Sequence, residues 1–107
     1  MTKIKGSFYF KQTKNNNLIG EFTNNSLNRN HTESADITTN YEAPFIGTFI
    51  STYHADNTSF LLSLIISYKP NSNNKIYDLK WLKGNNNEFE GQGFLVDDIL
   101  IGDYRSS

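Results

Sequence analysis

The sequence predicts an all-β protein, an antiparallel up-and-down meander of about eight short strands that forms a closed or nearly closed barrel. Three observations support this fold class. Apolar and polar residues alternate along several short segments, which is the period of a half-buried strand. Asn-rich turn sequences separate these segments, as at 15–17, 73–74 and 85–87. Apolar residues do not show the spacing of three or four that indicates a helix, so strands are expected throughout.

The first segments predict a hairpin. Residues 3–10 alternate strictly, and residues 18–23 supply the second strand after a turn at 14–17. Gly20 leaves room in that second strand for a close neighbouring backbone. The apolar face of the first strand consists of Ile4, Gly6, Phe8 and Phe10, opposite Lys3, Lys5, Ser7 and Tyr9.

Residues 24–43 are polar throughout and predict a long loop. Only Ala35 and Ile37 give an apolar alternation, which indicates a weak strand near 34–38. Whether 32–38 pairs in the sheet stays open at this level.

The centre of the chain predicts two longer strands. Residues 45–53 are rich in β-branched and aromatic side chains, and Pro44 stands at the start, where its missing N–H is harmless. Residues 59–68 are apolar on both faces, so this strand needs cover on two sides. Because no helix is expected to cover the outer face, we expect a second subunit there, contacting Leu61 and Ile65. A homo-oligomer is therefore predicted.

Three further strands complete the count, at 76–82, 88–96 and 99–104. The first of them places Tyr77, Leu79 and Trp81 on one face. A glycine followed two residues later by an aromatic residue recurs along the chain, which is typical of a strongly coiled sheet and favours a barrel over a flat sandwich. These pairs are Gly6 and Phe8, Gly20 and Phe22, Gly47 and Phe49, and Gly102 and Tyr104.

Length and charge limit the classes of function. A chain of 107 residues has room for a single domain, 1–107. A net charge of −1 with scattered Lys and Arg argues against a nucleic-acid partner. The absence of cysteine excludes disulfides and thiolate sites, and apolar runs are too short for a membrane span. We expect a cytoplasmic protein or a trimmed secreted domain, with no membrane partner.

Reactive side chains are sparse. His31 and His54 both fall in predicted loops, and neither has the short ligand spacing of a metal site. Glu88 and Glu90 lie two residues apart, which predicts a row facing solvent. We therefore expect no catalytic residue, no metal and no cofactor.

The aromatic residues are the most informative set. They lie near strand ends or at alternating positions, where they could line a barrel mouth and hold a small apolar or planar ligand. The alternative is that they fill the core, because an eight-stranded barrel has room for only its own side chains or one small ligand. The candidate ligand-binding residues are Tyr9, Tyr53, Tyr77, Trp81 and Tyr104, with Gln92, Ser63 or Asp103 to orient the ligand.

Two segments near the C-terminus carry a family resemblance. Residues 77–81, with sequence YDLKW, and 89–95, with sequence FEGQGFL, flank the turn 84–87 and resemble the sixth and seventh strands of avidin-like barrels. The opening GSFY at 6–9 is similar to the first strand of that family, and lipocalin-like barrels share this general pattern. The resemblance implies an eight-stranded barrel, commonly tetrameric, that holds a small ligand at one end with Trp81 in its wall.

The sequence thus predicts a non-catalytic barrel that binds a small molecule. The alternative is a protein–protein interaction or self-assembling module that uses residues 59–68. An enzyme is the third possibility, and it would require His54 or an inward-facing carboxylate beside a cavity.

Overall fold

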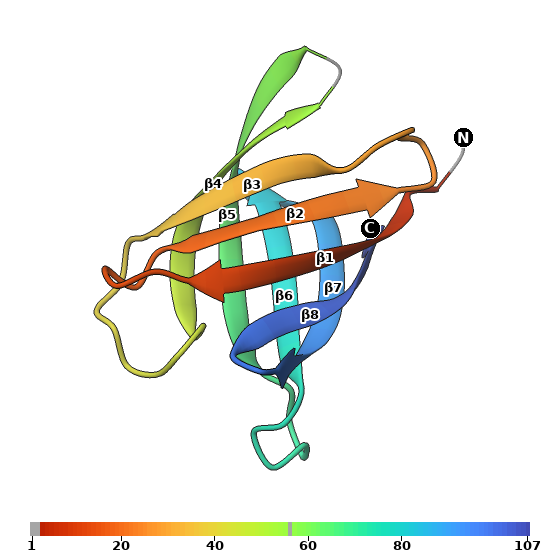
Figure 1. Cartoon of the computed structure of the whole chain (residues 1–107). Helices are drawn as coiled ribbons and strands as arrows, with labels where there is room; N and C mark the ends of the chain where they lie inside the picture. The colour runs from red at the N-terminus through yellow and green to blue at the C-terminus, as the bar shows by residue number, and fades with distance from the viewer. Residues whose placement is uncertain (1–2, 56) are drawn as a thin grey trace.

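The computed structural model describes residues 3–55 and 57–107 and shows a closed β-barrel (Figure 1). Each strand pairs antiparallel with the next, and β8 returns to pair with β1. The predicted fold class, an antiparallel meander barrel, is therefore confirmed. The strands are β1 (Lys5–Gln12), β2 (Leu18–Asn24), β3 (His31–Ile37), β4 (Gly47–Ala55), β5 (Thr58–Tyr68), β6 (Tyr77–Lys83), β7 (Asn86–Val96) and β8 (Ile99–Ser106). Across the described residues, no helix is long and apolar enough to cross a membrane.

The barrel has two different ends. At the closed end lie the connections β1–β2, β3–β4, β5–β6 and β7–β8, and the interior beside them is densely packed. The open end contains the start of β1, the end of β8, and the connections β2–β3, β4–β5 and β6–β7. The side chains that fill the closed half are each less than 2% exposed and include Phe10, Leu18, Phe49, Leu64, Ile66, Leu79 and Leu100.

Phe45 seals the closed end. Its backbone N–H donates to Oε1 of Gln12 at 3.2 Å, and its ring packs edge-on against Tyr77 with centroids 6.4 Å apart. The expectation that Phe45 begins a strand is wrong, because its φ of 68° is left-handed and cannot continue a strand. β4 begins two residues later, at Gly47.

β3 is a full member of the sheet. The segment 24–43 is predicted to hold only a weak strand near 34–38, but β3 starts at His31 and pairs with both β2 and β4. The expectation that His31 and His54 lie in loops is also wrong, since His31 opens β3 and His54 lies in β4. Pairing on both sides makes up for the polar composition, because the backbone hydrogen bonds are satisfied whatever the side chains are.

Two glycines make room for one aromatic ring at the open end. Tyr104 on β8 lies directly opposite Gly6 on β1 and Gly91 on β7. A Cβ on Gly6 would lie 2.0 Å from the carbonyl oxygen of Thr23, so that position accepts only glycine without a backbone shift. The sheet can therefore coil tightly there while Tyr104 points inward.

Candidate functional site

A cavity of about 300 Å³ occupies the open half of the barrel. Its floor is the packed interior of the closed half, and its walls come from all eight strands or the residues that flank them. This volume is at the lower end of the range for ligand pockets, so it suits a small ligand. The aromatic side chains in the wall are Phe8, Phe22, Tyr53, Phe60, Trp81, Phe89 and Tyr104.

Glu33 on β3 brings a carboxyl group into this aromatic interior. Only 6% of the residue is exposed. Its Oε2 accepts one hydrogen bond from Oγ of Ser51 at 2.5 Å and another from Nε1 of Trp81 at 2.8 Å. These donors come from β4 and β6, so three strands fix the position of the carboxyl group.

The electrostatic environment favours the neutral form of this group. Burial raises the pKa of the Glu33 carboxyl above its ordinary value, and the hydrogen bonds from Ser51 and Trp81 oppose that shift. The carboxyl group also satisfies the buried hydroxyl of Ser51 and the indole N–H of Trp81, so it is both buried and hydrogen-bonded beside the cavity.

Trp81 is held rigidly as the central ring of the wall. Its indole N–H is used by Glu33, and its ring lies edge-on to Phe8 at a centroid distance of 5.7 Å. Tyr104 packs against it from the other side at 5.8 Å. The ring plane of Trp81 is thus fixed by a hydrogen bond and by packing, which is the preorganisation that ligand recognition requires.

Tyr53 forms the wall next to Glu33, because the two residues are directly opposite in the β3–β4 register. Its ring stacks on Phe60 with centroids 5.0 Å apart and meets Phe22 edge-on. Burial, with the charges of Glu33 and Glu88, raises the pKa of Tyr53 to about 12. The hydroxyl therefore stays protonated at neutral pH and can act as a hydrogen-bond donor.

Tyr104 is anchored on the opposite wall. Its hydroxyl accepts from Nδ2 of Asn24 at 2.9 Å and donates to the carbonyl oxygen of Thr23 at 3.2 Å. Burial raises the pKa of Tyr104, although the bond from Asn24 acts against the shift. This residue is therefore a fixed, neutral part of the wall.

A β-bulge shapes the mouth of the cavity. The β6–β7 register shifts after Trp81, which pairs with Phe89, while Leu82 pairs with Asn87, so Glu88 has no partner on β6. The expectation that Glu88 and Glu90 form one solvent-facing row is wrong, because Glu88 lines the cavity and Glu90 pairs with Arg105 at 2.8 Å. Lys83 lies at the same mouth.

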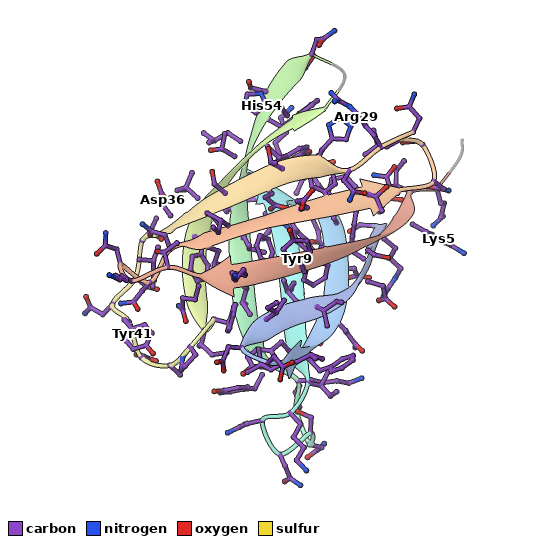
Figure 2. The ribbon with its side chains drawn as sticks, viewed as in Figure 1. Lys5, Tyr9, Arg29, Asp36, Tyr41 and His54 are labelled. Atoms are coloured by element: carbon purple, nitrogen blue, oxygen red, sulfur yellow. The ribbon has the colours of Figure 1, made fainter. Side chains whose placement is uncertain are left out.

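The structure brings three of the candidate ligand-binding residues together, since Tyr53, Trp81 and Tyr104 all line the cavity. Tyr9, Tyr77 and Gln92 do not line it. Tyr9 is on the outer face, where its hydroxyl donates to Oε1 of Glu21 at 2.5 Å (Figure 2). Tyr77 lies with Tyr68 and Phe45 at the closed end, and Gln92 is exposed.

The two predicted interface residues lie on the outside of β5. Leu61 is 65% exposed and Ile65 is 39% exposed, and they alternate with inward Leu62, Leu64 and Ile66. Both are therefore available to a partner.

Sequence reasoning missed the most distinctive residue of the site, Glu33. The pattern that would have found it is the alternation of Ala35 and Ile37, because extending that period backwards by one step places Glu33 on the same inward face. Phe22 and Phe89 were placed on strands but not in a site. Ser51 carries no such pattern, since nothing in the sequence shows that it is opposite a carboxylate.

The side chains of the two histidines contact groups other than the carboxyl group of Glu33. Nδ1 of the exposed His54 lies 2.8 Å from Oγ of Ser59, near the tip of the β4–β5 hairpin (Figure 2). His31 stacks on Phe22 with centroids 5.9 Å apart. Within residues 3–55 and 57–107, no group of three His, Asp or Glu side chains is placed to hold a metal ion.

The cavity contains the inward-facing carboxylate that an enzyme would require. Its hydroxyl neighbour, Ser51, has no exposed surface, so a substrate in the cavity cannot reach Oγ of Ser51. Nucleophilic catalysis needs an accessible nucleophile beside its base. Oγ of Ser51 is therefore not an accessible nucleophile for a molecule in the cavity.

A comparison with known proteins found no matching family model, no matching curated protein and no matching solved structure. The fold and the site define the class of protein as an eight-stranded antiparallel barrel with an aromatic cavity at one end.

Proposed function

We propose that this protein binds a small, apolar or planar molecule in the open half of its barrel. The observation that carries the proposal is the cavity of about 300 Å³, which has a packed floor, aromatic walls and one buried polar group at Glu33. A mostly apolar pocket with a few fixed polar groups is the usual form of a small-molecule site. If the side chains of the barrel filled its whole interior, no such cavity would remain.

The family resemblance supports the same reading. The segments at 77–81 and 89–95 resemble strands of avidin-like barrels, which hold a small ligand at one end, and lipocalin-like barrels share this arrangement. In this chain those segments lie on β6 and β7, and they contribute Trp81 and Phe89 to the cavity wall. The ligand itself is identified by the chemistry of the wall and not by the resemblance.

Fluorescence titration tests this function directly, because Trp81 is the one tryptophan of the chain. We expect a neutral aromatic probe, N-phenyl-1-naphthylamine, to bind saturably at one site and to quench or shift the emission of Trp81. Leu62→Phe places a larger side chain in the cavity wall. Because the added ring takes up space that the probe would occupy, binding of the probe should weaken about tenfold or more.

The matched control is Leu61→Phe, the same change at the neighbouring position on the outer face. It should leave the affinity unchanged. Equal effects of the two variants, or no saturable binding to the wild-type protein, would exclude the cavity as the binding site.

A second candidate function is self-assembly through the outer face of β4 and β5. Leu61, Ile65 and Ile50 are each at least 39% exposed there, and exposed apolar side chains that lie together on neighbouring strands are typical of an interaction surface. Because the barrel is closed, no strand edge of the sheet is free for pairing, so assembly would have to use such side chains. The partner we propose is a second copy of the chain.

Light scattering coupled to size-exclusion chromatography tests this second function. We expect a mass of two or more chains for the wild-type protein and a mass close to one chain of 12.2 kDa for Leu61→Lys with Ile65→Lys. Lys11→Leu, on the outer face of β1, is the control and should not change the mass. A wild-type protein that runs as a monomer at all concentrations would rule out self-assembly.

A further inference from the structure

One oxygen of the Glu33 carboxyl group, Oε1, accepts no hydrogen bond from the described residues. Both hydrogen bonds of the carboxyl group reach Oε2. Glu33 is 94% buried, as the complement of its 6% exposure, and it lines the cavity. Oε1 keeps some exposed surface, so it is the oxygen of this carboxyl group that is open to a hydrogen-bond donor supplied by a ligand.

No cation of the described chain neutralises this carboxyl group. The one ion pair among the described residues joins Arg105 to Glu90 on the outer surface. Lys83 is the only basic side chain that lines the cavity, and it is exposed at the mouth. An ionised Glu33 therefore lacks the counter-charge that buried carboxylates normally have.

Aromatic side chains surround the carboxyl group of Glu33. Nε1 of Trp81 lies 2.8 Å from Oε2, so a group bound at Oε1 is held next to the Trp81 ring. The indole N–H donates in the plane of that ring, so Trp81 turns its edge to the carboxyl group, and the attraction for a cation there comes from the charge of Glu33. Tyr53 lies directly across the β3–β4 register from Glu33.

We propose that the ligand is a small arylalkyl amine, whose ammonium group binds Oε1 of Glu33 while its ring packs among the aromatic side chains nearer the mouth. This inference rests on the proposed binding function and names its ligand class. An anionic ligand would instead meet two carboxylates, Glu33 and Glu88, in the same cavity. With a neutral ligand, burial still favours the neutral form of Glu33, whereas an ammonium group supplies the counter-charge that favours the ionised form.

The test uses three probes that share one ring and differ in charge, namely 2-phenylethylamine, 2-phenylethanol and phenylacetate. Calorimetric titration of the wild-type protein near neutral pH should show that the amine binds at least about tenfold more tightly than the alcohol, as expected for a charged hydrogen bond. Phenylacetate should bind most weakly. This ranking is measured in one protein, so it does not depend on the folding of any variant.

Glu33→Gln keeps an oxygen acceptor for Ser51 and Trp81 but removes the charge. We expect this variant to lose the preference for the amine while its affinity for 2-phenylethanol stays within about twofold. Glu90→Gln removes a carboxylate from the outer surface and should behave like the wild-type protein.

The outcomes separate this inference from the function on which it rests. Equal binding of amine and alcohol would overturn the amine proposal and leave the binding function standing, as would tighter binding of the alcohol or of phenylacetate. A Glu33→Gln variant that keeps the full preference would also overturn it. If none of the three probes bound while N-phenyl-1-naphthylamine did, the amine proposal would fail alone, and if no probe bound, both would fail.

Discussion

Glu33 places a buried carboxyl group in a cavity whose walls are mostly aromatic and aliphatic side chains. The free-energy cost of burying this group is partly offset by two hydrogen bonds, from Ser51 and Trp81. No positive charge among the described residues offsets it further. Replacing buried charged side chains by uncharged side chains of similar volume often leaves the stability of a protein unchanged or raises it. The residue therefore makes physical sense as part of a binding site more than as a structural element.

The raised pKa of Glu33 predicts how stability depends on pH. Since the folded protein holds this proton more tightly than the unfolded chain, stability falls as pH rises from the ordinary value of 4.5 through the folded pKa, and is then constant. The loss is about 1.4 kcal/mol for each unit by which the pKa is raised. Chemical denaturation at a series of pH values measures this slope.

The same measurement on variants isolates Glu33 from the other titrating groups. Glu33→Gln should remove this part of the slope and be more stable than the wild-type protein above the folded pKa, whereas Glu90→Gln should retain the slope. Tyr53 and Tyr104 stay protonated over this range because their pKa values are raised, so they add nothing to it. A Glu33→Gln variant that is less stable at high pH would show that the carboxylate is stabilised in a way the structure does not reveal.

The choice of site residues shows what alternation in a sequence can and cannot establish. Alternation places Tyr9 on the face of its strand that is opposite to the face of Phe8, and it places Gln92 on the face opposite to that of Gly91. The structure puts Tyr9 and Gln92 outside the cavity. It also places Tyr77 and Trp81 on one face, and both point inward. Alternation does not show which end of the barrel is open, so it could not separate Trp81 in the cavity from Tyr77 in the closed half.

At the scale of elements, seven of the eight strands carry an apolar pattern, either alternating or continuous, that is strong enough to be recognised from the sequence. β3 is different, because Ile37 is the one large apolar residue on its inward face, which otherwise carries His31, Glu33 and Ala35. The polar character of β3 is what produces the functional group in the cavity. The weakest strand in the sequence is therefore the one that carries the most distinctive residue of the site.

The bulge in β7 could not be predicted either. It depends on the register between β6 and β7, where Leu82 pairs with Asn87 and leaves Glu88 unpaired. The left-handed backbone of Phe45 is equally invisible in a segment of apolar residues, since such residues favour a strand. Both features are set by closure of the barrel and not by local preference.

The coiling of β1 against β2 predicts a specific sensitivity at Gly6. A Cβ there would lie 2.0 Å from the carbonyl oxygen of Thr23, so Gly6→Ala must shift the backbone, and we expect it to lower the free energy of unfolding by about 3 kcal/mol. Gly84→Ala is the matched control, because no atom lies within 4 Å of its Cβ and only its φ of 61° is unfavourable. It should cost about 1 kcal/mol.

Urea denaturation followed by circular dichroism measures both changes. If Gly6→Ala were no more costly than Gly84→Ala, the close approach of β1 and β2 would not be a constraint on the barrel. The ring of Tyr104, which lies opposite Gly6, would then have to be placed by other contacts.

At the scale of the whole molecule, one barrel has a packed half and a half with a cavity, and the second is the half that we propose for ligand binding. The closed half contains fully buried side chains such as Phe10, Phe49 and Leu100, and Phe45 seals its end. The open half keeps a cavity in which rings and one carboxyl group are already fixed by packing and hydrogen bonds. A rigid support of this kind lets the open half remain unfilled without collapse of the sheet.

The most direct test of the binding site observes Trp81 itself during a titration. Its indole N–H gives one side-chain resonance in a proton–nitrogen correlation spectrum, because the chain has a single tryptophan. Addition of 2-phenylethylamine should shift this resonance saturably, together with backbone amides around Glu33 and Tyr104, while amides of the closed half such as Leu100 stay in place. A Trp81 resonance that does not move, with shifts confined to the outer face or to none of the amides, would contradict the cavity as a binding site.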